Sequence, residues 1–88
     1  MAIYSTPAEV SSEIEALVKE HVSMDVDLSP DTLLEDDLSV DSLERVELGV
    51  KLEKKFGISL PDDKIRQSAT VGDLIQLVLD AQNASNVH

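Results

Sequence analysis

The 88-residue sequence contains no cysteine and no tryptophan, and it has only one tyrosine, one phenylalanine, three glycines and three prolines. Without cysteine, the chain can form neither a disulfide framework nor a thiolate metal site. With so few aromatic residues, the core has to be built from leucine, valine and isoleucine, so we expect an aliphatic core. A chain of this length forms one small domain, which leaves little room for a large catalytic cleft.

Basic residues and long apolar runs are also scarce. The chain has 7 Lys+Arg against 18 Asp+Glu, a formal net charge of -11 at pH 7. This balance argues against nucleic-acid binding, because few cations could neutralise phosphates, and it favours partners with basic surfaces. No stretch reaches membrane-spanning length, and the first residues lack the basic and apolar regions of a signal peptide. We therefore expect no stable membrane insertion and a cytoplasmic location.

The spacing of capping residues and apolar side chains predicts an all-α fold. A Thr or Asp followed three residues later by Glu or Asp marks a helix start, and this pattern begins at Thr6, Asp41 and Thr70. Gly57 offers a stop for the second helix, and Pro61 opens a short helical turn. We expect helices over residues 7–22, 41–56, 62–67 and from 71 onward. They predict a small four-helix bundle, a single domain over residues 1–82, with a flexible tail over 83–88.

The segment between the first two long helices, residues 23–40, lacks sustained helical periodicity. A loop of this length in a compact domain is usually functional or contains a short turn of its own. We expect five of its apolar residues to hold it against the core: Val26, Leu28, Leu33, Leu34 and Leu38.

The predicted helix over residues 41–56 has two apolar stripes. One stripe repeats every four residues and can face the core: Leu48, Leu52 and Phe56. The other lies on nearly the opposite side of the helix: Leu43, Val46 and Val50. Because only one side of the helix can face the core, the second stripe is exposed or meets a partner.

Ser42 lies in the first turn of this helix. A catalytic serine needs a base and oxyanion donors, but the only histidines are His21 and His88, and no glycine-rich elbow surrounds Ser42. We therefore do not expect hydrolase activity. The unpaired amides and the positive dipole end of a helix start favour a negative group, so the position suits a phosphate ester. By spacing alone, an ordinary helix-start serine is an equally good interpretation.

Several acids flank this serine: Asp36, Asp37, Asp41 and Glu44. Their spacing does not follow the EF-hand pattern, and the glycine that a calcium loop requires is missing. Solvated acids and a helix cap explain them better, so we expect no metal site. A calcium-responsive helical domain stays open as an alternative, and it predicts a change in helicity or melting at modest calcium.

Residues 35–65, EDDLSVDSLERVELGVKLEKKFGISLPDDKI, resemble the central segment of bacterial type II acyl carrier proteins. The hallmark of that family is Asp-Ser-Leu after an Asp-Leu-Gly-x run. The first amphipathic helix, the long loop and TVGDL at the start of the last helix are similar too, so the resemblance covers roughly residues 8–80. It implies an acyl-carrier-protein-like bundle and a carrier that is not an enzyme.

The resemblance implies that Ser42, between Asp41 and Leu43, bears a 4′-phosphopantetheine arm added from coenzyme A by a phosphopantetheinyl transferase. The arm would hold an acyl chain as a thioester for loading, elongating and transferring enzymes with basic docking patches. The positions assigned to partner recognition are Leu43, Glu44, Arg45, Val46, Glu47 and Val50. For Glu47 and Glu53 an ordinary solvated charge is an equally good interpretation. A monomer is expected, with no catalytic residue and no metal ligand.

Some residues depart from the family pattern. Ser39 replaces the usual glycine, which strains the loop if this position needs a positive φ. Gly49 lies inside the second helix, where it costs about 1 kcal/mol relative to alanine but permits close helix approach. Ser68 stands where the family often has an apolar residue near the mouth of the acyl pocket.

The second helix, which is dominated by acids in housekeeping members of the family, here also contains Arg45 and Lys51, and it has Lys54 and Lys55 where the family commonly has glutamates. A neutral helix should be steered less strongly toward basic patches, which favours a carrier for a dedicated lipid or polyketide pathway over a housekeeping carrier of fatty acid synthesis. Drift on a tolerant surface is the alternative. The competing function is an unmodified acidic helical adaptor that works through protein contacts only, and Ser42 is the residue that distinguishes it from a carrier.

Overall fold

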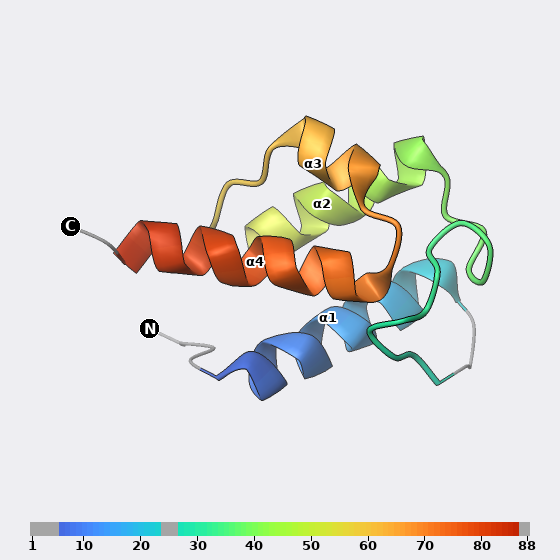
Figure 1. The fold of residues 1–88 in the computed structure, drawn as a ribbon, viewed down its shortest axis with the longest axis horizontal. Helices are drawn as coiled ribbons and strands as arrows, with labels where there is room; N and C mark the ends of the chain where they lie inside the picture. Colours follow the sequence, from blue (N-terminus) through green and yellow to red (C-terminus); the bar gives the residue numbers. More distant parts are fainter. Residues whose placement is uncertain (1–5, 24–26, 87–88) are drawn as a thin grey trace.

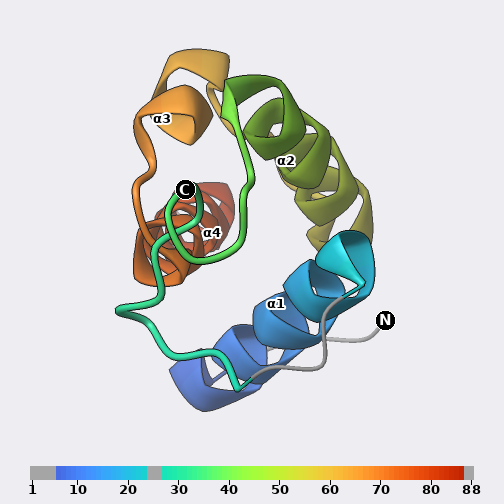
Figure 2. The ribbon, with the colours of Figure 1, turned by 90° about the vertical axis from the view of Figure 1, so that its right-hand side faces the viewer.

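The computed structural model describes residues 6–23 and 27–86. Within these ranges the chain forms four helices and no strand: α1 (Pro7–Val22), α2 (Ser42–Phe56), α3 (Asp62–Gln67) and α4 (Val71–Asn86). Helices α1 and α4 lie side by side and run in opposite directions, and α2 and α3 lie next to each other above them (Figure 1). Figure 2, an end-on view, shows the four helices arranged around one centre. The predicted four-helix bundle is confirmed.

The helix ends follow the local capping signals. Thr6 Oγ1 accepts a hydrogen bond from the Glu9 amide at 3.2 Å, and the Thr6 amide donates to Glu9 Oε1 at 3.3 Å. At the start of α4, Thr70 and Asp73 form the same reciprocal pair at 3.1 and 3.2 Å. Helix α2 ends at Gly57, whose φ of 66° lies in the left-handed region that glycine adopts without strain. Each of these predicted ends is confirmed.

Helix α4 extends to Asn86, so residues 83–86 belong to the helix. The division into a domain over residues 1–82 and a tail over residues 83–88 stays a prediction. The sequence over 83–86, Asn-Ala-Ser-Asn, contains neither proline nor glycine, so nothing in it stops the helix. The flexibility of the tail stays a prediction, and residues 87 and 88 lie outside the described residues.

The core is aliphatic, as the composition predicted. Every buried hydrophobic residue in the described part of the chain is a valine, leucine or isoleucine, while Phe56 is only partly buried at the edge of the cluster. All four helices contribute, and the loop before α2 contributes as well. No helix in the described ranges is long and apolar enough to cross a membrane.

The loop before α2 is held against the core largely as predicted. Leu34 and Leu38 are buried, and Leu28 packs partly buried against the same cluster. Val40 is also fully buried, and its amide donates to the Leu34 carbonyl at 2.8 Å, which folds the loop back on itself just before α2. Val26 lies outside the described residues. The loop therefore holds the residues just before α2 in a fixed position.

Leu33 does not join the core, so its predicted role as an anchor is wrong. Its side chain is 38% exposed. The backbone of Leu33 forms an isolated antiparallel bridge with Thr70, at the start of α4. Neighbouring side chains of an extended segment point to opposite sides, so burial of Leu34 turns Leu33 outward.

Helices α2 and α3 approach each other closely at Gly49. This glycine is buried, and a Cβ atom added to it would overlap the side chain of Ile65 on α3. Ile65 itself is 1% exposed. The glycine inside α2 therefore permits the close approach that the sequence suggested, with α3 meeting α2 near its middle.

Candidate functional site

Ser42 is the first residue of α2, and its side chain is exposed. The N-cap residue Asp41 accepts a hydrogen bond on Oδ1 from the Glu44 amide at 2.9 Å, and its carbonyl accepts from the Arg45 amide at 2.9 Å. Within the described part of the chain, Ser42 Oγ makes no hydrogen bond. The first turn is thus held by Asp41, while the serine hydroxyl projects free from it.

The electrostatics of this turn favour a negative group on Ser42. The first amides of a helix have no partner within the helix, and the aligned peptide dipoles place partial positive charge there. Asp41 satisfies the amide of Glu44, and no residue among those described pairs with the amides of Ser42 and Leu43. A phosphate ester on Ser42 would lie beside this positive end.

The two apolar stripes of α2 separate as predicted. On the inner stripe, Leu48 and Leu52 are fully buried, and Phe56 packs partly buried against the core. On the outer stripe, Leu43 is 75% exposed and Val50 is 42% exposed, while Val46 is half-buried. Leu43 and Val50 are therefore exposed apolar residues of α2, and Leu43 directly follows Ser42. A role of this stripe in partner recognition stays a prediction.

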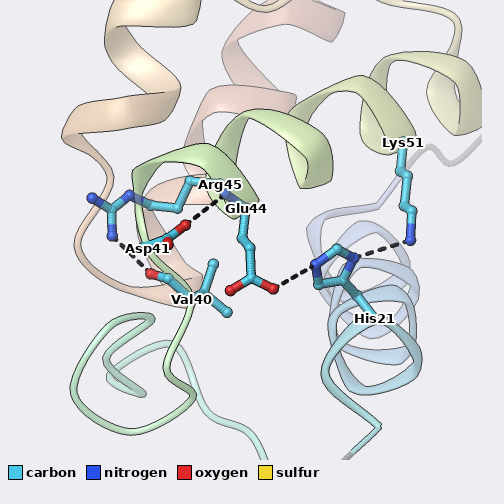
Figure 3. A network of polar contacts seen from close by, with 6 residues as sticks. All are labelled: His21, Val40, Asp41, Glu44, Arg45 and Lys51. Carbon is cyan, nitrogen blue, oxygen red and sulfur yellow. Dashed lines mark hydrogen bonds and ion pairs between the residues drawn. The ribbon is translucent and has the colours of Figure 1, made fainter.

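Arg45 extends toward the preceding loop (Figure 3). Its Nη1 donates to the Val40 carbonyl at 3.1 Å, and its buried Nε has no hydrogen-bond partner within the described residues. The side chain is half-buried. Arg45 therefore braces the end of the loop against the first turn of α2, a role that the sequence did not indicate.

A cavity of about 190 Å³ lies beside Arg45, between the loop over residues 33–36 and the C-terminal end of α3. Polar side chains line much of it, among them Arg66 and Ser68. Ser68 is 4% exposed, and its hydroxyl donates to the Lys64 carbonyl at 3.0 Å. The acids Glu35 and Asp36 line the cavity as well, so the lining is polar and of mixed charge.

Ser39 adopts the strained conformation that the sequence raised as a possibility. Its φ is 58°, in the left-handed region. The Ser39 amide donates to the Glu35 carbonyl at 3.0 Å, which closes a turn just before α2. A residue with a Cβ in this conformation costs roughly 1–2 kcal/mol relative to the right-handed form, which glycine would avoid. The loop before Ser42 is held in this shape by its buried neighbours.

Two bases of α2 engage α1, which the sequence did not predict. Lys55 Nζ lies 2.9 Å from Glu13 Oε1, and Lys51 Nζ lies 3.0 Å from His21 Nδ1. On its other side, His21 Nε2 lies 3.5 Å from Glu44 Oε2 (Figure 3). Two of the lysines that balance the acids of α2 therefore contact side chains of α1. Nothing local in the sequence signals these contacts, since the partners are far apart along the chain.

Glu53 has a structural role. From the sequence, we considered only partner recognition or a solvated charge for this residue. Its Oε2 accepts a hydrogen bond of 2.7 Å from the Leu60 amide, in the segment between α2 and α3. Glu47 is exposed, and its side chain makes no hydrogen bond or ion pair among the described residues. Glu53 thus fixes the loop that leads into α3, and Glu47 stays available on the surface.

In the described part of the chain, no three acidic or histidine side chains gather as a metal site would require.

Comparison with known proteins shows the family. Residues 12–78 match the family described as Phosphopantetheine attachment site. The acyl carrier protein of Sulfurovum sp. (strain NBC37-1) is 47% identical over 66 residues, which cover 69% of this chain and 88% of that protein. This chain belongs to the acyl carrier protein family, whose members are carriers and not enzymes, and membership implies a covalently attached 4′-phosphopantetheine.

Two solved structures share the fold. A candidate acyl carrier protein from Mycobacterium tuberculosis has a TM-score of 0.76 and 28% identity, covering 81% of this chain and 96% of that chain. A 3-oxo-butyl acyl carrier protein from the actinorhodin polyketide synthase of Streptomyces coelicolor has a TM-score of 0.68 and 26% identity, covering 99% of this chain and all of that one (100%). The arrangement of the four helices is therefore that of a carrier domain.

Proposed function

We propose that Ser42 is the residue that bears the 4′-phosphopantetheine arm, with Asp41 and Leu43 as its immediate surroundings. The observation that carries this proposal is an exposed serine hydroxyl, without a hydrogen-bond partner in the described residues, at the N-terminus of α2. When bound, the arm supplies the thiol that this cysteine-free chain lacks, and an acyl group is held on it as a thioester. Asp41 keeps the first turn in place, and the helix start favours the phosphodiester.

The attachment step requires a separate phosphopantetheinyl transferase. A bond forms between Ser42 Oγ and the phosphorus of coenzyme A that carries the pantetheine. The phosphoanhydride bond breaks, adenosine 3′,5′-bisphosphate leaves, and the serine proton passes to a base. No base in the described part of this chain lies within hydrogen-bonding distance of Ser42 Oγ, so the transferase has to supply it.

We further propose that one face of α2 binds the transferase and the loading, elongating and transferring enzymes. This docking face consists of Leu43, Glu44, Val46, Glu47 and Val50. Its apolar residues provide contact area, and its acids steer the chain toward basic patches. An interface of this kind forms quickly and releases quickly, as a carrier that visits several enzymes requires. Arg45, which the resemblance placed with these residues, serves the docking face by holding the loop before Ser42.

The cavity beside Arg45 supports a proposal for the class of cargo. Because Arg66 and Ser68 line it, an acyl group with oxygen substituents would lie there at a lower desolvation cost than a long saturated chain. The similarity to a carrier of a polyketide synthase supports the same choice. We therefore propose a carrier for a dedicated polyketide or specialised lipid pathway, acting as a monomer in the cytoplasm, in place of a housekeeping carrier of fatty acid synthesis.

Mass spectrometry of the intact protein tests the attachment residue. The chain, a Ser42→Ala variant and a Ser39→Ala variant are incubated with coenzyme A and a broad-specificity phosphopantetheinyl transferase. We expect one phosphopantetheine on the wild type and on Ser39→Ala, and none on Ser42→Ala, because Ser39 is an exposed serine of the same segment outside the site. Modification of Ser42→Ala would place the arm elsewhere. An unmodified wild type, beside a fully modified control carrier, would favour the adaptor function.

A further inference from the structure

His21 lies between two side chains of α2, near the C-terminal end of α1. Its side chain is 9% exposed. One ring nitrogen, Nδ1, faces Lys51 Nζ at 3.0 Å, and the other, Nε2, faces Glu44 Oε2 at 3.5 Å (Figure 3). The imidazole therefore connects two side chains of opposite charge that lie on the same helix, almost two turns apart.

The chemistry of the two partners decides where the imidazole proton lies. An ammonium group has hydrogen-bond donors and no acceptor, so Lys51 donates to Nδ1. Nδ1 then holds a lone pair, and the single ring proton lies on Nε2, where it faces the carboxylate of Glu44. The three side chains thus form one directed series, from Lys51 through His21 to Glu44, and each member restricts the rotation of the next.

We propose that His21 is a positioning residue for partner docking at Ser42. The proposal rests on the function proposed above for Ser42 and the docking face. Glu44 belongs to that face and lies two residues after Ser42, and its side chain is 44% exposed although it pairs with His21. A carboxylate that is already ordered loses less rotational freedom when a basic patch binds it. Holding Lys51 on His21 also keeps a positive charge from moving among the acids of the docking face, where it would repel basic partners.

A second polar contact between the same helices provides a matched control. Lys55 and Glu13 form an ion pair of 2.9 Å between α2 and α1, one turn beyond Lys51 and farther along α2 from Ser42. If α1 only supports α2 as a scaffold, loss of either contact should affect docking equally. If His21 positions Glu44, only loss of the His21 contacts should weaken docking.

The test is the steady-state kinetics of phosphopantetheine transfer, with this chain as the varied substrate. For His21→Leu we expect KM to rise about three- to tenfold with kcat unchanged, because Glu44 then has to be ordered on docking and Lys51 is free to move among the acids of the docking face. His21→Gln should restore KM, since the amide oxygen can accept from Lys51 and the amide nitrogen can donate to Glu44. Glu13→Gln should match the wild type. Glu44→Gln should raise KM, and adding His21→Leu to it should change little more.

A spectroscopic measurement accompanies the kinetics. Nitrogen-15 NMR of the imidazole should show a protonated Nε2 and an unprotonated Nδ1 in the wild type, and Lys51→Met should shift the Nδ1 resonance. A protonated Nδ1 in the neutral ring would overturn the proposal.

The kinetic outcomes separate this proposal from the function on which it rests. An unmodified wild type would overturn the proposed function itself. A modified wild type with equal KM for the wild type and folded His21→Leu would overturn only the positioning role. Circular dichroism shows whether His21→Leu folds, and if it does not, an unchanged KM for Glu44→Gln overturns the positioning role instead.

Discussion

Helix α2 is joined to α3 and to α1 in two different ways. Toward α3 the contact is apolar and close, with Gly49 against the buried side chain of Ile65. Toward α1, the contacts at the surface are polar: Lys55 with Glu13, and His21 between Lys51 and Glu44. In close apolar packing an added side chain forces its neighbours to shift, whereas water competes for exposed polar contacts. The α3 side should therefore govern stability, and the α1 side should govern the orientation of functional side chains.

The largest effect is expected on the α3 side. Gly49→Val should lower the free energy of unfolding by about 3 kcal/mol, because the new side chain overlaps Ile65 and forces the helices apart. Urea unfolding followed by circular dichroism measures the change. Gly57→Ala is the control, since it adds a methyl group at a φ of 66° with nothing within 4 Å, so only backbone strain of about 1 kcal/mol is expected. Equal losses in the two variants would contradict the steric explanation.

An intermediate effect is expected where α2 leads into α3. Glu53→Ala should lower stability by about 1.5 kcal/mol, because the part-buried amide of Leu60 loses its charged acceptor. Hydrogen exchange of the Leu60 amide should quicken at the same time. Glu47→Ala, which removes an exposed carboxylate from the same helix, should stay within about 0.5 kcal/mol of the wild type. A similar loss in both variants would show that helix charge, and not the hydrogen bond, is responsible.

The smallest effect on stability is expected on the α1 side. Glu13→Gln should cost less than about 0.5 kcal/mol at low salt, because its ion pair with Lys55 is partly exposed. At high salt the difference should disappear through screening. Thermal melting at two salt concentrations measures this. A loss of stability that persists at high salt would mean that the polar contacts with α1 also support the fold. The α1 and α3 sides of α2 would then differ less in their contribution to stability than the structure indicates.

The elements that the sequence predicted well depend on interactions within a few residues. Thr6 with Glu9 and Thr70 with Asp73 close their caps locally, and Gly57 ends α2 by its own backbone freedom. Burial of Leu48 and exposure of Leu43 follow from helical spacing once one side of α2 faces a core. The sequence contains no signal for the end of α4, because no residue near position 82 stops a helix.

The contacts that the sequence missed join residues that only the fold brings together. His21 and Lys51 are 30 positions apart, and Glu53 and Leu60 meet across the turn between two helices. Arg45 was assigned to the docking face by resemblance, but the position of the loop gives its guanidinium a carbonyl to bind. Such pairs depend on how rigid elements pack, and no short pattern of residue types encodes that packing.

The sequence by itself determined the helices, the aliphatic core, the family and the prediction that Ser42 bears the arm, because capping, periodicity and the Asp-Ser-Leu motif are local properties of the chain. The tertiary structure decided the rest. It placed Ser39 in a left-handed conformation, turned Leu33 outward, opened a cavity beside Arg45 and joined His21 to Glu44. Each of these follows from the loop and α1 being packed against α2 in one arrangement, which fixes distances between residues far apart in the chain.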